Sequence, residues 1–93
     1  MPIRYHIDAA TGLPHIYNHE VSEHEVEDIL ARPVRDIRGR NDSRIALGQT
    51  QQGRYLKVIY VPDPLPNSVF VITAYELGPK AKRALRRRKR RKR

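Results

Sequence analysis

The stretch RIALGQTQQGRYLKVIYV, residues 44–61, gives the strongest indication of the fold. Residues 44–50 favour a strand. The segment Gln51-Gln52-Gly53 that follows favours a tight turn, because glycine adopts positive φ without steric cost. Residues 55–61 are apolar on nearly both faces, as expected of a central strand that is covered on both sides. This stretch therefore predicts two neighbouring strands of a small sheet.

The residues around this stretch extend the same sheet. Residues 62–67, PDPLPN, contain three prolines and predict a loop. Residues 69–76, VFVITAYE, form a further β-rich run, and the short connections predict an antiparallel meander. Near the N-terminus, residues 2–8 alternate apolar and polar side chains, which is typical of a half-buried strand. We therefore expect an antiparallel sheet of three to four strands.

A helix is predicted between the first strand and the meander. Ser22 is a typical N-cap residue, and Glu25 stands three residues later, which completes the pattern of a capping box. Pro33 disfavours helical geometry at the residue before it, so the helix is expected to cover residues 23–31. Residues 34–42 are polar and contain glycine, and they are expected to form a loop. The resulting fold class is α+β.

The net charge of +9 is concentrated at the C-terminus. Residues 80–93 hold 11 of the 19 basic residues and no acidic residue, so residues 1–79 have a slight negative net charge. Gly78-Pro79 is expected to open a basic C-terminal helix that frays beyond Leu85, where every residue is Lys or Arg. A polybasic tail attracts polyanions, RNA above all, by releasing counterions from phosphates. The alternative is a solvated end that binds nothing.

Length and composition limit the number of domains, the kinds of site and the localisation that we expect. The chain of 93 residues allows one domain, residues 1–85, followed by the polybasic tail, residues 86–93. It has no cysteine, which excludes disulfides and thiolate zinc sites and suits a reducing cytoplasm. No apolar run approaches the ~20 residues that span a bilayer, and the N-terminus has no apolar signal region. We therefore expect a cytoplasmic protein without a membrane partner.

Four histidines, His6, His15, His19 and His24, stand early in the chain. The segment around His19 and His24 resembles a zinc-protease motif, but that motif needs two histidines four residues apart on one helix. His19 and His24 are five apart, and Ser22 as the N-cap places His19 outside the helix, so no metal site is expected. The histidines remain open as proton-transfer groups because imidazole titrates near neutral pH.

Basic and aromatic residues are interleaved on the predicted strands. Arg44, Arg54 and Lys57 lie on or beside them, among several tyrosines. RNA cleavage by a 2′-hydroxyl needs a proton acceptor, a proton donor and a cation near the phosphate, and such residues can supply these. Aromatic rings beside cations also stack unpaired bases. The alternative is structural, since tyrosine is common in strands.

Three blocks of the sequence resemble the BrnT family of bacterial toxins, which are RelE-like ribonucleases. These blocks are NHEVSEHEVEDIL, RIALGQTQQGRYLKVIYV and VFVITAYELGPKAKRALRRR, and they cover roughly residues 15–88. The resemblance implies a RelE-like α+β fold and metal-independent RNA cleavage, on or off the ribosome, that inhibits translation. It also implies no cofactor and an antitoxin protein as partner. An acidic antitoxin could dock on the polybasic tail by charge complementarity.

The resemblance also suggests roles for individual residues. Arg44 and Arg54 match basic positions of the family's middle block and are expected to hold phosphate, with Tyr75 and Glu76 as proton-transfer candidates. The family typically has Ser-Ala-Arg where this chain has Thr73-Ala74-Tyr75. This difference leaves a non-catalytic RNA-binding module of the same fold as the alternative function. The remaining RNA contacts are expected from Lys57, Lys80, Lys82, Arg83, Arg86, Arg87, Arg88, Lys89 and Arg90.

Overall fold

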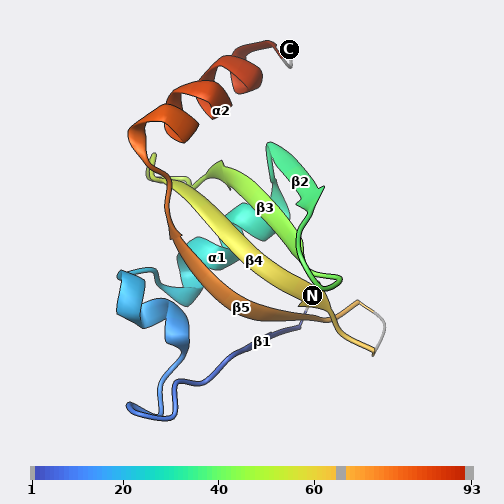
Figure 1. The fold of residues 1–93 in the computed structure, drawn as a ribbon. Helices are drawn as coiled ribbons and strands as arrows, with labels where there is room; N and C mark the ends of the chain where they lie inside the picture. Colours follow the sequence, from blue (N-terminus) through green and yellow to red (C-terminus); the bar gives the residue numbers. More distant parts are fainter. Residues whose placement is uncertain (1, 65–66, 92–93) are drawn as a thin grey trace.

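In the described part of the chain, five strands form one mixed sheet in the order β1-β5-β4-β3-β2 (Figure 1). The computed structural model describes residues 2–64 and 67–91, and of residues 90 and 91 the backbone alone. β1 runs parallel to β5, and the other neighbouring strands are antiparallel. The elements are β1 (Ile3–Tyr5), η1 (His15–His19), α1 (Glu23–Ala31), β2 (Arg35–Arg38), β3 (Arg44–Gln49), β4 (Tyr55–Pro62), β5 (Val69–Glu76) and α2 (Pro79–Arg91).

The predicted α+β class, the β3-β4-β5 meander and the helix over residues 23–31 are confirmed. The prediction of three to four antiparallel strands is wrong, because the sheet has five strands and one parallel pair. Residues 34–42 are also more than a loop, since they contain β2. β2 is an edge strand with mostly exposed side chains, so it lacks the apolar pattern by which strands are recognised. β1 can pair in parallel with β5 because a long connection separates the two strands: the chain passes through η1 and α1, enters the sheet at the far edge as β2, and reaches β5 after β3 and β4.

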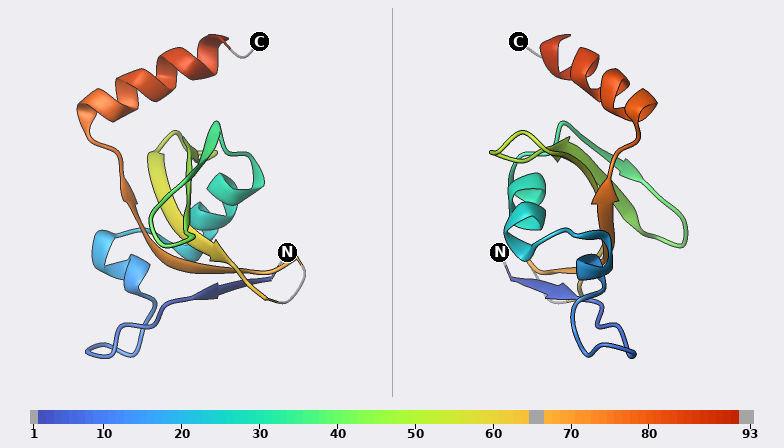
Figure 2. Two further views of the ribbon diagram at one scale, coloured as in Figure 1. Left: turned by 45° about the vertical axis from the view of Figure 1, so that its right-hand side comes forward. Right: turned by 90° about the vertical axis from the view of Figure 1, so that its left-hand side faces the viewer.

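α1 begins at the predicted capping box and covers one face of the sheet (Figure 2). The backbone N–H of Glu25 donates to Ser22 Oγ at 3.1 Å, and the backbone N–H of Ser22 donates to Glu25 Oε1 at 3.0 Å. Val26 and Ile29 of α1 are fully buried in a core that the strands complete. The core side chains of the strands include Ala46, Leu56, Val58, Tyr60, Val71 and Ala74.

The other face of the sheet, which we call the open face, is defined by strand register. Directly paired residues project to the same side of a sheet. Arg35 pairs with Leu47, Leu47 with Lys57, and Lys57 with Tyr75, so these four side chains form one row across four strands. Their neighbours in sequence, such as Ala46 and Val58, belong to the core. The row therefore faces away from α1.

α2 lies beyond the end of the sheet that carries Tyr55 (Figure 1). Leu85 is 3% exposed, so this helix packs one apolar residue inward. The expected fraying after Leu85 is not observed, because the helix continues to Arg91. Arg86 lies over the Tyr55 ring and Lys89 Nζ donates to Gln49 Oε1, so the sheet itself supports the charged part of the helix. Residues 92 and 93 of the predicted tail lie outside the described residues.

Candidate nucleic-acid interface

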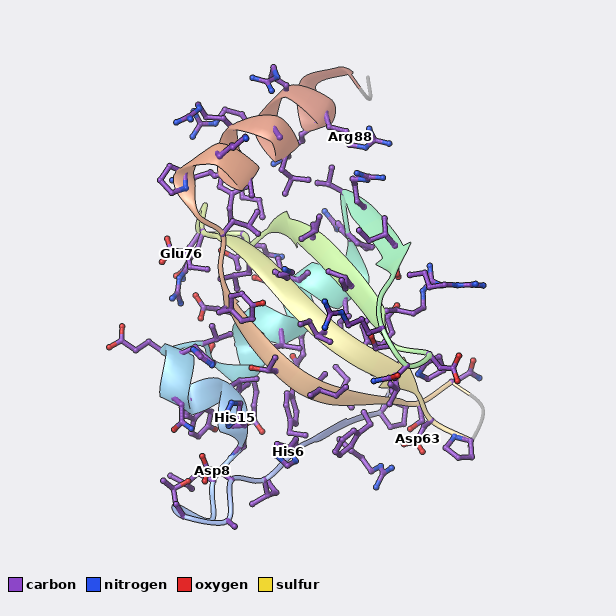
Figure 3. The ribbon with its side chains drawn as sticks, viewed as in Figure 1. His6, Asp8, His15, Asp63, Glu76 and Arg88 are labelled. Atoms are coloured by element: carbon purple, nitrogen blue, oxygen red, sulfur yellow. The ribbon has the colours of Figure 1, made fainter. Side chains whose placement is uncertain are left out.

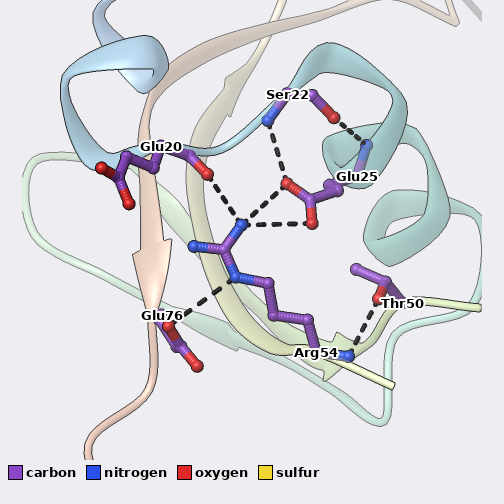
Figure 4. Close-up of polar contacts among 6 residues, drawn as sticks. All are labelled: Glu20, Ser22, Glu25, Thr50, Arg54 and Glu76. Atoms are coloured by element: carbon purple, nitrogen blue, oxygen red, sulfur yellow. Dashed lines mark hydrogen bonds and ion pairs between the residues drawn. The ribbon is translucent and has the colours of Figure 1, made fainter. Parts of the chain in front are cut away.

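Arg54 is held by groups of the protein itself (Figure 4). Its Nη1 donates to both carboxylate oxygens of Glu25, at 2.9 and 3.1 Å, and to the carbonyl oxygen of Glu20 at 2.7 Å. Its Nε lies 3.7 Å from Oε1 of Glu76. The Arg54 side chain is 26% exposed. Arg54 therefore joins the start of β4 to the N-terminal turn of α1, with its charge matched by carboxylates.

Arg44 is held in the same way at the opposite end of the β3–β4 pair. Its Nε donates to Asp36 Oδ1 at 2.8 Å, and its Nη2 donates to the carbonyl oxygen of Asp36 at 3.1 Å. The hydroxyl of Tyr60 donates to the other carboxylate oxygen of Asp36 at 2.5 Å. Burial and then the contact with Asp36 raise the pKa of Tyr60 to about 12. Arg44, Asp36 and Tyr60 thus form a polar cluster between β2, β3 and β4.

Tyr75 lies on the open face, where its cross-strand neighbour is Lys57. Lys57 Nζ is 5.4 Å from the centre of the Tyr75 ring, which is the range of a cation–π contact. Glu76 pairs with Leu56 and lies on the opposite side, beside Arg54. The residues expected to share one catalytic site therefore occupy three places. Of the expected site residues, Arg44 lies apart from the others, in its cluster with Asp36 and Tyr60. Arg54 and Glu76 lie beside each other, and Tyr75 lies beside Lys57.

A line of aromatic rings continues from Tyr75 along the edge of the sheet. We call it the ring strip, and it consists of Tyr75, His19, His15, His6 and Phe70. The centres of successive rings are 5.5, 5.4, 5.8 and 6.4 Å apart in that order. Lys57 lies over the ring at one end of the strip, and the guanidinium of Arg4 lies 5.3 Å from the centre of the Phe70 ring at the other.

The histidines of the ring strip come from η1 and from the segment after β1. The sequence identified them as proton-transfer candidates but did not connect them with Tyr75. His15 and His19 stand at the two ends of η1, which packs against β5. Figure 3 shows His6 and His15 close together, with Asp8 nearby. In the described part of the chain, no group of three or more His, Asp or Glu residues is arranged to hold a metal ion.

α2 places further cations beside the open face. Lys82 Nζ and the guanidinium of Arg86 lie 5.6 and 5.7 Å from the centre of the Tyr55 ring. A hollow of about 320 Å³ lies between α2 and strands β2 and β3, with Leu47 and Leu85 in its lining. The Arg90 side chain lies outside the described residues. The other cations expected to contact RNA from this helix are exposed, namely Lys80, Arg83, Arg87, Arg88 and Lys89.

Comparisons with known proteins identify no relative of this chain: no family model, curated protein or solved structure matches it. Among the helices of residues 2–64 and 67–91, none has the length and apolar character needed to cross a membrane.

Proposed function

We propose that this protein binds single-stranded RNA along the ring strip and α2, and cleaves it as a toxin-like endoribonuclease of a type II toxin–antitoxin pair. The observation that carries the proposal is the ring strip itself, with the Lys57 ammonium group at one end. At the other end lies the Arg4 guanidinium, which is paired with Asp63. Successive unpaired bases stack on aromatic rings, at about 1–3 kcal/mol per base, while cations beside the rings attract the phosphates. The strip offers both kinds of contact in one continuous line.

Lys57 is the cation best placed to meet a phosphate next to the rings. Within the described residues, its Nζ makes no ion pair with a carboxylate, whereas Arg44 and Arg54 each make one. An arginine already paired with a carboxylate gives up that pairing when it binds phosphate, which lowers its net contribution. We therefore propose that Lys57, with Tyr75 beside it, takes the phosphate-contacting role that the sequence suggested for the two arginines.

α2 supplies the long-range attraction in this proposal. Its exposed cations lie on one helix next to the open face, and each one that meets a phosphate releases counterions. Such phosphate contacts add affinity but do not distinguish one RNA sequence from another. An acidic antitoxin is part of the proposal as well, because the same helix would attract it by charge complementarity. The resemblance to BrnT proteins is the support for this partner and for inhibition of translation.

A non-catalytic RNA-binding module is the second candidate function. The observation that favours it is the ion pairing of Arg44 and Arg54, which removes both expected phosphate-holding arginines from a shared site. The ring strip and α2 would then bind RNA and leave it intact.

The test is translation in a bacterial cell-free extract, with RNA integrity followed in the same samples. We compare the full-length protein, Lys57→Ala and the matched control Arg40→Ala, which removes an exposed cation from the loop between β2 and β3. Cleaved RNA and lost translation with wild type and Arg40→Ala, both weakened by Lys57→Ala, would support the proposal. Intact RNA that is recovered with the protein from the same extract would favour the second candidate, and RNA that is neither recovered with the protein nor cut would contradict both.

A further inference from the structure

We infer that His15 and His19 carry the two proton transfers of RNA cleavage, one as general base and the other as general acid. This inference rests on the proposed function and adds the residues of its chemical step. The centres of the two rings are 5.4 Å apart, and the ring planes are inclined by 72°. On its far side His19 contacts Tyr75, which in turn lies under the Lys57 ammonium group. The pair thus stands next to the proposed phosphate contact.

The fold holds the two imidazoles at this spacing through η1. Ile16, between them in sequence, is 1% exposed and anchors η1 in the core. The turn ends at Glu20, whose left-handed backbone conformation (φ 58°) lets its N–H donate to Tyr17. Both histidines therefore project from one anchored turn, so their separation is set before any ligand binds. Preorganised groups of this kind lower the cost of reaching the reactive geometry.

Asp8 orients His15. Its Oδ2 lies 3.5 Å from Nδ1 of His15 and accepts a hydrogen bond from Nδ2 of Asn18 at 2.6 Å, and Asn18 Nδ2 also lies 3.3 Å from the same ring nitrogen. The backbone N–H of Ala10, the Asn18 amide and His15 hold the pKa of Asp8 below its usual value, so this group remains a carboxylate. In the described part of the chain, the polar side-chain contacts of His15 are all at Nδ1. Its Nε2 is left for a substrate.

The proposed cleavage step uses only the RNA and the two histidines. One imidazole removes the proton of the ribose 2′-hydroxyl, and the 2′-oxygen forms a bond to phosphorus. The bond between phosphorus and the 5′-oxygen breaks, and that oxygen takes the proton of the other histidine, which begins as imidazolium. The products are a 2′,3′-cyclic phosphate and a 5′-hydroxyl. Lys57 would stabilise the charge that develops on the phosphate oxygens.

The pH dependence follows from the groups around the pair. Asp8 and Asn18 face His15 on one side and His6 faces it on another, while Tyr75 faces His19 with Lys57 behind it. Cleavage needs one neutral and one protonated imidazole, so its rate should show a bell-shaped dependence on pH. Removing either histidine should remove one limb of the bell.

The test uses the full-length protein with a single-stranded RNA oligonucleotide and a matched oligonucleotide whose 2′-hydroxyls are replaced by hydrogen, which can be bound but not cut. We compare His15→Gln, His19→Gln and the control His24→Gln, which changes a histidine on α1 whose side chain is 92% exposed. Single-turnover cleavage is measured from pH 5 to pH 9, and binding of the uncleavable oligonucleotide is measured in parallel.

We expect His15→Gln and His19→Gln each to lose one stacking ring, which weakens binding of the uncleavable oligonucleotide by about 5- to 150-fold. Each should also cleave RNA about 10²- to 10⁴-fold more slowly, even at a protein concentration that saturates the RNA. Each should lose one limb of the pH profile, and His24→Gln should match wild type. Cleavage by both variants at the wild-type rate and pH profile would overturn the inference and leave the proposed function intact. Cleavage by both variants that returns to the wild-type rate once the RNA is saturated would also overturn it, by making the histidines contact residues only. Wild-type protein that binds RNA without cutting it would contradict the proposed cleavage and, with it, this inference.

Discussion

Arg54 and Glu25 join the turn between β3 and β4 to the first turn of α1, with Nη1 of the arginine 2.9 and 3.1 Å from the two carboxylate oxygens. The same carboxylate accepts the N–H of Ser22 in the capping box. One side chain thus caps the helix and fixes the helix to the sheet. This arrangement assigns Arg54 a role in stability that does not depend on RNA.

Replacing Arg54 should therefore destabilise the fold. We expect Arg54→Ala to lower the free energy of unfolding by about 1–3 kcal/mol, because it removes hydrogen bonds between charged groups that are only partly exposed. Urea denaturation followed by circular dichroism measures this, since the chain has no tryptophan. Arg40→Ala, which removes an exposed charge, should change the same quantity by less than about 0.5 kcal/mol. Equal stability of the two variants would contradict the structural role.

Ser22→Ala should also destabilise the protein, by about 1 kcal/mol, because it removes the side-chain acceptor of the capping box. Its effect should not simply add to that of Arg54→Ala, since both changes release Glu25 from a partner: its backbone N–H loses Ser22 Oγ, and its carboxylate loses Arg54. A double-mutant cycle measures the coupling. A coupling energy of zero within error would show that the two contacts of Glu25 are independent.

Stability should decline at alkaline pH. Burial raises the pKa of Tyr60 to about 12, above the ordinary value of 10.0, and burial does the same for Tyr5. Below pH 10 both phenols keep their protons in the folded and unfolded chain, so the stabilisation is complete. Between pH 10 and pH 12 the unfolded chain ionises first, and the free energy of unfolding falls.

Tyr60→Phe is the variant that tests this dependence. It should reduce the slope of stability against pH between 10 and 12 to about half, because Tyr5 supplies the remainder. Chemical denaturation at a series of pH values measures the slope. The control is Leu13→Ala, which changes an exposed residue without a titratable group and should keep the wild-type slope. An unchanged slope in Tyr60→Phe would contradict the assignment.

The cations of α2 should set the salt dependence of RNA binding. Replacing Arg83, Arg87 and Arg88 by glutamine should flatten the slope of log affinity against log salt by about 2, if most of the three contact phosphates. Thermal stability should change little, because these side chains are exposed. Affinity measured from 50 to 300 mM salt tests this, and a slope equal to that of wild type would exclude these three side chains from the RNA contact.

Local sequence predicted the elements that local interactions create. The helix over residues 23–31 follows from the capping box at Ser22 and from Pro33, and β5 follows from an apolar run bounded by loop residues. β2 could not be found in this way, because an edge strand with polar side chains looks like a loop. β1 has the expected alternation, but its parallel pairing depends on where the intervening helices place the chain.

The candidate site was harder to predict, because it depends on contacts between segments that are far apart in the sequence. The meander implies that Lys57 and Tyr75 lie on neighbouring strands, and both were among the expected site residues. The contact between His19 and Tyr75 depends on the packing of η1 against β5, which no local pattern indicates. The partner of Arg54 stands 29 residues earlier in the chain, so the sequence could not show that this arginine is already engaged.

The parallel pairing of β1 with β5 has a consequence for how the molecule folds. Ile3 pairs with Val69, so this contact closes a far longer stretch of chain than the turn between β3 and β4 does. Long-range contacts form slowly, because the entropy of closing the loop is lost before the contact stabilises anything. β1 should therefore dock late, and until it does, the backbone groups of β5 form an unpaired edge. That interval is when the chain is most open to association with other copies through strand pairing.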